Sequence, residues 1–211
     1  MTNNNQSGRS MIEMLGVLAI IGVLSVGGIA GYSKAMMKFK INKTIDQISQ
    51  IAQNVRVLYA RQKNYGNLNT KIAYKANLAP REMFEDGSGS YSMTNPFGGY
   101  VELFSANSST NSDNKSFVIG FHGLPDEACI ELATQDWGSD TSSGLIAVGI
   151  SAAGSGSFLK WIEGTSTGYD NGAGGGAVAV PNGTRLSTPL PIDVAVEACS
   201  GNNNLVSLKF K

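Results

Sequence analysis

The hydrophobic residues of this chain form one long uninterrupted block near its start. From Met14 to Ser33, twenty residues carry no formal charge, and the block is bounded by Glu13 and Lys34. A helix of twenty residues is about 30 Å long, which matches the hydrocarbon core of a bilayer. The pattern therefore predicts a helix that is able to span a membrane, with one carboxylate at its start.

Beyond this block, the hydrophobic residues follow the spacing of an amphipathic helix. No proline occurs before Pro80, so nothing in the sequence forces a break in the helix. Apolar residues recur at intervals of three and four, which is the helical period: Ile41, Ile45, Ile48, Ala52, Val55 and Tyr59. We predict one helix from about residue 10 to about residue 63, in which residues 9–33 form an apolar half and residues 34–63 an amphipathic half.

The remaining residues, 64–211, alternate between turn signals and short apolar runs. Short helices are predicted near 69–79, from 125 to about 137, and from 191 to about 199. Strand-like runs occur at 100–104, 117–121, 145–150, 158–162 and 205–210. Several strands after one long N-terminal helix predict an α+β fold, in which residues 64–211 form a single globular head.

Charge is distributed unevenly between these parts. Residues 1–63 contain eight Lys and Arg against two acids, a net charge of +6, whereas residues 64–211 have a net charge of −6. The basic residues lack interleaved aromatic residues and lie beside a membrane segment, which argues against nucleic acid as a partner. The 26 Gly and the low charged fraction of 15% are typical of a loop-rich extracellular domain.

The candidate chemical groups are few. In an exported protein, Cys129 and Cys199 are expected to form one disulfide, and the alternative is two buried thiols. Two Cys and one His, His122, give no ligand set of the usual spacing, so we predict no metal and no cofactor. A Gly-x-Ser-x-Gly match at 164–168 is followed by a Gly-rich loop, whereas a nucleophile elbow needs a helix there. We predict no catalytic residues and no enzyme.

The start of the chain resembles the processing site of type IV prepilins and secretion pseudopilins. The shared motif is a glycine, four residues and a glutamate at the head of an apolar helix, here Gly8 and Glu13. The resemblance implies that a prepilin peptidase removes residues 1–8 as a leader peptide, cuts between Gly8 and Arg9, and methylates the new amine of Arg9. It also implies that Glu13, the fifth mature residue, pairs with the terminal amine of a neighbouring subunit. The match departs from the family at Arg9, where Phe or Met is usual, and in the absence of Lys and Arg from the leader.

The apolar segment has three other interpretations. A cleaved secretory signal would end near Ser25-Val26-Gly27, but its apolar region is normally shorter than this block. An ordinary single-pass anchor does not explain Gly8 and Glu13 together, and a soluble core helix is rarely apolar all round. The resemblance implies an N-terminus in the cytoplasm, whereas the lysines after the block would favour the opposite orientation.

The head resembles the type IVb major pilins, the group of the toxin-coregulated and colonisation-factor pilins. The resemblance rests on Asn95-Pro96-Phe97, on residues 116–124 leading to Cys129, and on Cys199 shortly before a C-terminal strand. It implies a pilin αβ-roll, in which the long helix packs on an antiparallel sheet and the C-terminal strand is inserted in the sheet interior. The disulfide-bounded region 129–199 would then form much of the outer surface.

The function implied is that of a structural subunit that polymerises into a type IV pilus for adhesion, aggregation or colonisation. Its expected partners are other copies of itself, the prepilin peptidase, the inner-membrane pilus assembly machinery and, before assembly, the membrane. Its expected location is the bacterial inner membrane as a prepilin, and then an extracellular pilus on the cell surface. The alternatives are a minor pilin or type II secretion pseudopilin, and a membrane-anchored adhesin or binding module that never polymerises.

Overall fold

The computed structural model of the protein describes residues 7–84, 91–107, 113–137, 144–152, 160–163, 189–199, 201 and 203–211. The chain divides into two compact units, Met1–Lys40 and Ile41–Lys211, and we call the second the head unit. The predicted Gly-rich loop that follows residue 163, with its Gly-x-Ser-x-Gly match, lies outside the described residues. The first two residues of the strand predicted at 158–162 lie outside them as well.

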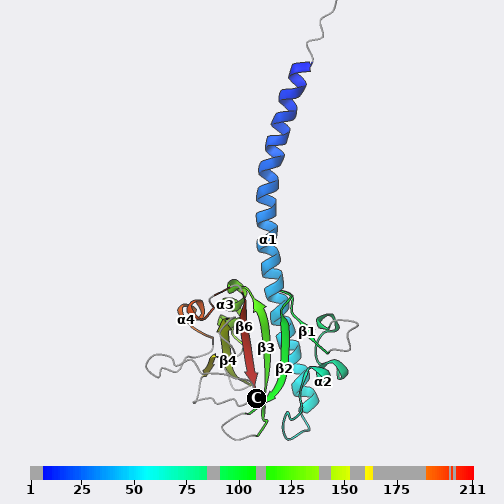
Figure 1. Cartoon of the computed structure of the whole chain (residues 1–211), viewed down its shortest axis with the longest axis vertical. Helices are drawn as coiled ribbons and strands as arrows, with labels where there is room; N and C mark the ends of the chain where they lie inside the picture. Colours follow the sequence, from blue (N-terminus) through cyan, green and yellow to red (C-terminus); the bar gives the residue numbers. More distant parts are fainter. Residues whose placement is uncertain are drawn as a thin grey trace, which may run out of the picture. The chain divides into compact units, whose positions relative to one another are not determined.

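One long helix, α1 (Ser7–Tyr59), confirms the prediction of a continuous N-terminal helix (Figure 1). The helix ends four residues earlier than predicted, because the chain turns at this point. The amide of Gln62 donates to the carbonyl of Tyr59 at 2.8 Å, which closes a turn. The amide of Tyr65 then donates to the carbonyl of Asn114 at 2.7 Å, and this bond directs the chain toward the sheet.

The head unit contains a six-stranded antiparallel sheet in the order β1-β2-β3-β6-β4-β5. Its strands are β1 (Met93–Thr94), β2 (Tyr100–Ala106), β3 (Ser116–Leu124), β4 (Leu145–Ala152), β5 (Lys160–Glu163) and β6 (Asn204–Phe210). The C-terminal strand β6 lies between β3 and β4, as Figure 1 shows, so the expected insertion of this strand in the sheet interior is confirmed.

Within the described ranges, four short helical segments accompany the sheet: α2 (Thr70–Lys75), η1 (Arg81–Met83), α3 (Asp126–Thr134) and α4 (Ile192–Ala198). The side chain of Asn69 caps α2, because its Oδ1 accepts a hydrogen bond of 3.0 Å from the amide of Ile72. Helix α3 ends three residues before the predicted position. There the indole of Trp137 turns back and donates to the carbonyl of Leu132 at 3.0 Å.

The predicted apolar stripe of α1 is buried in the head unit. Ile41, Ile48 and Val55 are fully buried, and Tyr59 is 7% exposed. The guanidinium of Arg56 lies 5.1 Å from the ring centre of Phe210, which places this end of α1 against β6. A row of aromatic rings continues this contact, with centroid distances of 5.3 Å for Tyr59–Tyr65, 4.8 Å for Tyr65–Phe117 and 5.4 Å for Phe117–Phe210.

The turn before β2 explains the Asn95-Pro96-Phe97 motif. The side-chain amide of Asn95 donates to the carbonyl of His122 at 2.7 Å, and its Oδ1 accepts from the amides of Phe97 and Gly99. A Cβ at Gly99 would lie 1.8 Å from the His122 oxygen, so only glycine allows this approach. Gly123 faces Gly99 across the contact and has a positive φ of 70°.

Candidate assembly surface and disulfide site

The apolar half of α1 exposes its large side chains. From Met11 to Ile29, every large apolar side chain is between 51% and 75% exposed. By length and composition, this helix is able to cross a membrane. Space is also open at its glycines, since an added Cβ would meet no atom within 4 Å at Gly16, Gly22, Gly27, Gly28 or Gly31. The described part of the subunit therefore leaves this surface uncovered, and a bilayer or other helices would have to cover it.

Glu13 lies on this uncovered surface, within the first two turns of α1, and its side chain is exposed. The backbone of Gly8 and Arg9 belongs to the same helix, but their side chains lie outside the described residues. The cleavage after Gly8, the methylation of Arg9 and the pairing of Glu13 with a neighbouring amine therefore stay predictions.

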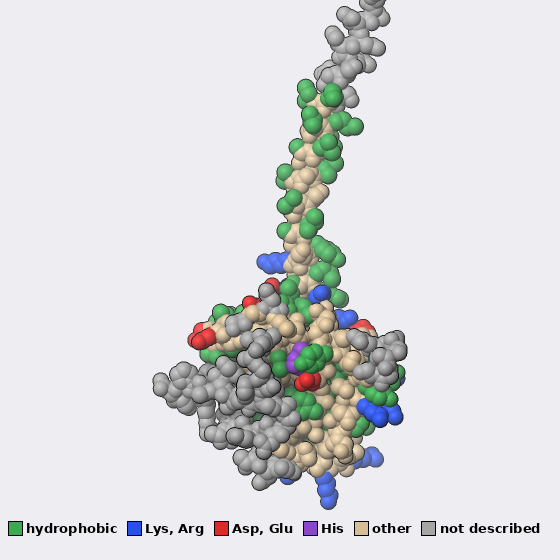
Figure 2. Space-filling view, viewed as in Figure 1, with side chains coloured by type: hydrophobic (Ala, Val, Ile, Leu, Met, Phe, Trp, Pro, Cys, Tyr) green, Lys and Arg blue, Asp and Glu red, His purple; other side chains and the backbone are tan. Residues whose placement is uncertain are grey.

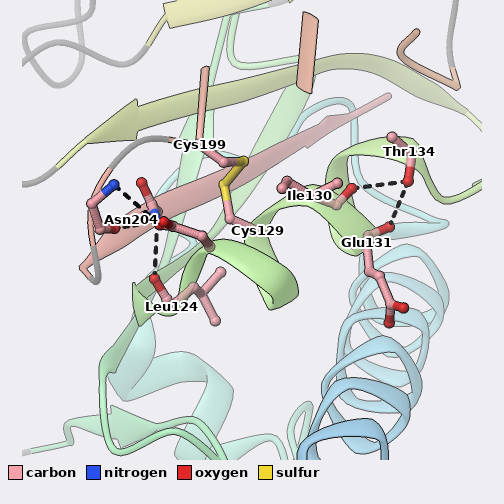
Figure 3. Close-up of a disulfide and its surroundings, with 9 residues drawn as sticks. Leu124, Cys129, Ile130, Glu131, Thr134, Cys199 and Asn204 are labelled. Carbon is pink, nitrogen blue, oxygen red and sulfur yellow. Dashed lines mark hydrogen bonds between the residues drawn. A yellow bond between two sulfur atoms is a disulfide. The ribbon is translucent and has the colours of Figure 1, made fainter. Parts of the chain in front are cut away.

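The expected disulfide joins Cys129 of α3 to Cys199, the residue after α4 (Figure 3). Their Cα atoms are 5.9 Å apart, the bond spans 70 residues of sequence, and both side chains are buried. In the chain-entropy view, a bridge over a loop of this length stabilises the folded state by about 4 kcal/mol. The disulfide fixes α4 to α3, and it thereby holds the C-terminal side of the region 129–199 in place.

Asn204 forms a hydrogen-bond network beside the disulfide that sequence reasoning missed. Its side chain is fully buried at the start of β6, and its amide donates to the carbonyl of Leu124 at 3.2 Å and to Oδ1 of Asp126 at 2.8 Å (Figure 3). The same carboxylate accepts from the amide of Gly201 at 3.1 Å. Asp126, in the first turn of α3, thus ties this helix to the start of β6. No signal distinguishes Asn204 from the asparagines that precede it.

His122 lies near the end of β3, in a small polar cluster on the sheet. Its ring stacks on Tyr100 with centroids 3.6 Å apart, and its Nε2 lies 3.5 Å from Oε2 of Glu102. Burial, and secondarily the charge of Glu102, raise the pKa of Tyr100. The sequence does not show this cluster, because it depends on the register between β2 and β3.

An ion pair connects α1 to η1. The ammonium of Lys43 lies 3.0 Å from Oε1 of Glu82, and the side chain of Gln47 donates to the same oxygen at 3.4 Å. The hydrogen bond from Lys43 is the main cause that lowers the pKa of Glu82. Both partners are partly exposed, so the pair fixes geometry more than it adds stability.

The part of the chain that the structure describes contains no candidate metal site. Over these residues, no three His, Cys, Asp or Glu side chains come together as metal ligands would. Both cysteines are held in the disulfide, which removes the softest ligands.

The long apolar N-terminal helix, the antiparallel sheet with its C-terminal strand inside, and the single disulfide together define a pilin-like α+β protein. The chain belongs to the Bundlin family of type IVb pilins, whose sequence model matches residues 34–210. The predicted family resemblance is confirmed. Members of this family are structural proteins and not enzymes. Membership implies that the subunit assembles with copies of itself into a filament. It also implies a location first in a membrane and then in a surface pilus.

Two solved structures are similar to this chain. TcpA, a type IV pilin from the Vibrio cholerae El Tor biotype, is 18% identical with a TM-score of 0.50, over 82% of this chain and 99% of that one. A type IVb pilin from Salmonella typhi is 17% identical with a TM-score of 0.43, over 75% of this chain and 93% of that one. No curated protein matches the chain in sequence. At this identity, the likeness to TcpA establishes the fold, and with it the predicted fold class is confirmed.

Proposed function

We propose that this protein is the major subunit of a type IVb pilus and forms a homopolymeric filament for adhesion, aggregation or colonisation. The observation that supports this most directly is the uncovered apolar half of α1. Large apolar side chains from Met11 to Ile29 are at least half exposed, although apolar surface is worth about 25 cal/mol per Å² when it leaves water. A bilayer covers this surface before assembly, and bundled α1 helices of neighbouring subunits cover it in the filament.

Glu13 gives the bundle its register in this proposal. A carboxylate among apolar helices is costly unless assembly brings it a cation. Processing between Gly8 and Arg9 creates that cation, because it exposes a methylated but still charged amine on Arg9. The prepilin peptidase performs this step in the inner membrane, and the inner-membrane assembly machinery then moves the subunit into the filament.

The head supports a major pilin over a minor pilin or a secretion pseudopilin. The disulfide bounds a large segment, residues 129–199, and a segment of this size favours a pilin over a pseudopilin. The competing function from another class is a membrane-anchored adhesin that never polymerises, in which α1 is an anchor and Glu13 has no partner.

The test is the mass of the N-terminal peptide in a fraction sheared from the cell surface. A chain that begins at Arg9 and is one methyl group heavier, and that is abundant in this fraction, supports a processed major pilin. The same peptide at trace level favours a minor pilin. A chain that begins at Met1 and stays with the membrane contradicts processing and supports the anchored adhesin.

A substitution separates filament assembly from anchoring. Glu13→Gln removes the carboxylate and should abolish or strongly reduce surface filaments, while the processed subunit still accumulates in the membrane. The matched control is Asp46→Asn, since Asp46 is an exposed acid on the same helix, within the head unit. Normal filaments with Glu13→Gln would contradict the register role of Glu13.

A further inference from the structure

The head unit has an exposed apolar pair on α4 that is flanked by acids. Ile192 and Val196 are 69% and 54% exposed, and they lie four residues apart, so they share one side of the helix. Asp193 and Glu197 are exposed next to them. We call these four residues the acidic face. The described residues of α3, α4 and their flanks, 125–137 and 189–199, contain six acids and no Lys or Arg.

A second exposed apolar pair lies at the end of α1 and is flanked by bases. Val57 is 77% exposed and Leu58 is 42% exposed. Arg61 and Lys63 follow in the exposed turn after the helix, and we call these four residues the basic face. Between residues 47 and 81 the chain contains no acid at all, so no acid lies near the basic face in the sequence.

The two faces match each other in composition and oppose each other in charge. Within the part of the chain that the structure describes, Arg61, Lys63, Asp193 and Glu197 form no ion pair, and all four residues are exposed. Figure 2 shows acidic side chains gathered over α4 and Lys and Arg side chains on the opposite side of the head, toward α2.

We propose that the acidic face of one subunit docks on the basic face of a second copy of this chain. Ile192 and Val196 would cover Val57 and Leu58, while Asp193 and Glu197 pair with Arg61 and Lys63. The two faces are different surfaces of one molecule, so the contact is heterologous and propagates into an open helical array instead of closing a dimer. This inference rests on the proposed filament function and names the head surfaces that extend it.

A second copy of this chain would use both exposed faces, because the acidic face and the basic face complement each other. An unrelated partner would use only one of them. Each exposed ion pair contributes little on its own, but every interior subunit of a filament uses both of its faces. The apolar pairs supply the burial, and the charges select the orientation and reject like-with-like contacts.

Zero-length carbodiimide crosslinking tests the contact, because this reagent joins a lysine amine only to a carboxylate that touches it. In filaments sheared from cells, Lys63 should become linked to Asp193 or Glu197. In the same subunits dispersed in detergent, this product should fall at least tenfold. Lys75 of α2 is the internal control, since it is exposed and lies outside both faces, and it should form no link to Asp193 or Glu197 in either state.

The outcomes separate this inference from the proposed function. Absence of surface filaments overturns both. Filaments in which Lys63 links to neither acid overturn the docking contact alone. Filaments in which Asp193 and Glu197 react freely with an added small amine show that the acidic face is open to an outside partner, and they overturn docking of a second copy.

Charge reversal gives an independent test. Lys63→Glu and Glu197→Lys should each reduce the filament yield about three- to tenfold, because an attractive pair becomes a repulsive one. The double variant should recover to within about twofold of the unmodified protein. Lys75→Glu makes the same charge change on α2, outside the faces, and should leave the yield unchanged. A double variant as poor as the single ones overturns the pairing of Lys63 with Glu197.

Discussion

The close contact between Gly99 and β3 makes a sharp prediction about stability. A Cβ at Gly99 would lie 1.8 Å from the carbonyl oxygen of His122, whereas ordinary contact begins at 3.4 Å. Gly99→Ala must therefore move one backbone segment by about 1.6 Å, since the clash is with backbone atoms that cannot rotate away. Such a shift breaks the hydrogen bonds of 2.7 Å from Asn95 to His122 and of 2.8 Å between the Asn95 amide and the Gly99 carbonyl.

The expected loss follows from these terms. Overpacking costs about 1–3 kcal/mol, and each of the two hydrogen bonds contributes about 0.5–1.5 kcal/mol. Gly99→Ala should thus lower the free energy of unfolding by about 2–6 kcal/mol. The neighbouring Gly98 is the matched control, because it has a positive φ of 86° but open space around a Cβ. Gly98→Ala should cost only the strain of a left-handed residue, about 1–2 kcal/mol.

The assay is urea unfolding of the full chain in a mild detergent, followed by tryptophan fluorescence, with the midpoint and slope compared between variants. The two glycines are adjacent, so effects of composition and unfolded-chain entropy are nearly equal for them. Equal losses at Gly98 and Gly99 would refute the steric reasoning. A smaller loss at Gly99 would show that β2 and β3 approach each other less closely than the structure indicates.

Three further predictions concern the head. Replacing both Cys129 and Cys199 by Ala should lower the free energy of unfolding by about 4 kcal/mol, measured by urea unfolding; a loss below about 1 kcal/mol would contradict the loop-closure argument. Asn204→Ala should cost about 2–3 kcal/mol, because it removes the side-chain donor to the Leu124 carbonyl and one of the two donors to the Asp126 carboxylate; an unchanged midpoint would exclude that role. Glu82→Gln should cost less than about 1 kcal/mol at pH 7, since the pair with Lys43 is exposed. Lys43 lowers the pKa of Glu82, so the ion pair stabilises the fold above the ordinary value of 4.5, and the difference between the variants should vanish as the pH falls below it; a difference that persists at pH 3 would contradict this cause.

Local signals in the sequence were sufficient for most elements of the fold. The helical spacing of the Ile and Val residues predicted the buried stripe of α1, and Pro125 followed by two acids predicted the start of α3. The short apolar runs predicted β2, β3, β4 and β6, because strands that contribute to a core must contain them. Two short elements, β1 and η1, were not predicted, since two or three residues are too few to establish a period.

Contacts between distant segments could not be predicted in the same way. Asn204 meets Asp126 across 78 residues of sequence, and His122 meets Glu102 only because β2 and β3 pair in one register. The burial of β6 was not predicted either, since an alternating strand is expected to have one exposed face. Ser207 and Lys209 are 1% and 4% exposed, so successive side chains on both faces of this strand are buried. The pairing and packing of distant segments decide these features, and neither has a local signal.

The position of β6 has a consequence for how the head becomes stable. The strands β1, β2 and β3 form one antiparallel group, and β4 pairs with β5, but these two groups meet only through β6 among the described strands. The sheet therefore stays in two parts until residues 204–210 are inserted, and non-local pairing of this kind is slow compared with hairpin formation. Asn204 and the Cys129–Cys199 disulfide both lie where β6 begins. Asn204 and the disulfide fix the start of β6 beside α3. They therefore stabilise the position of the strand that joins the two groups of described strands.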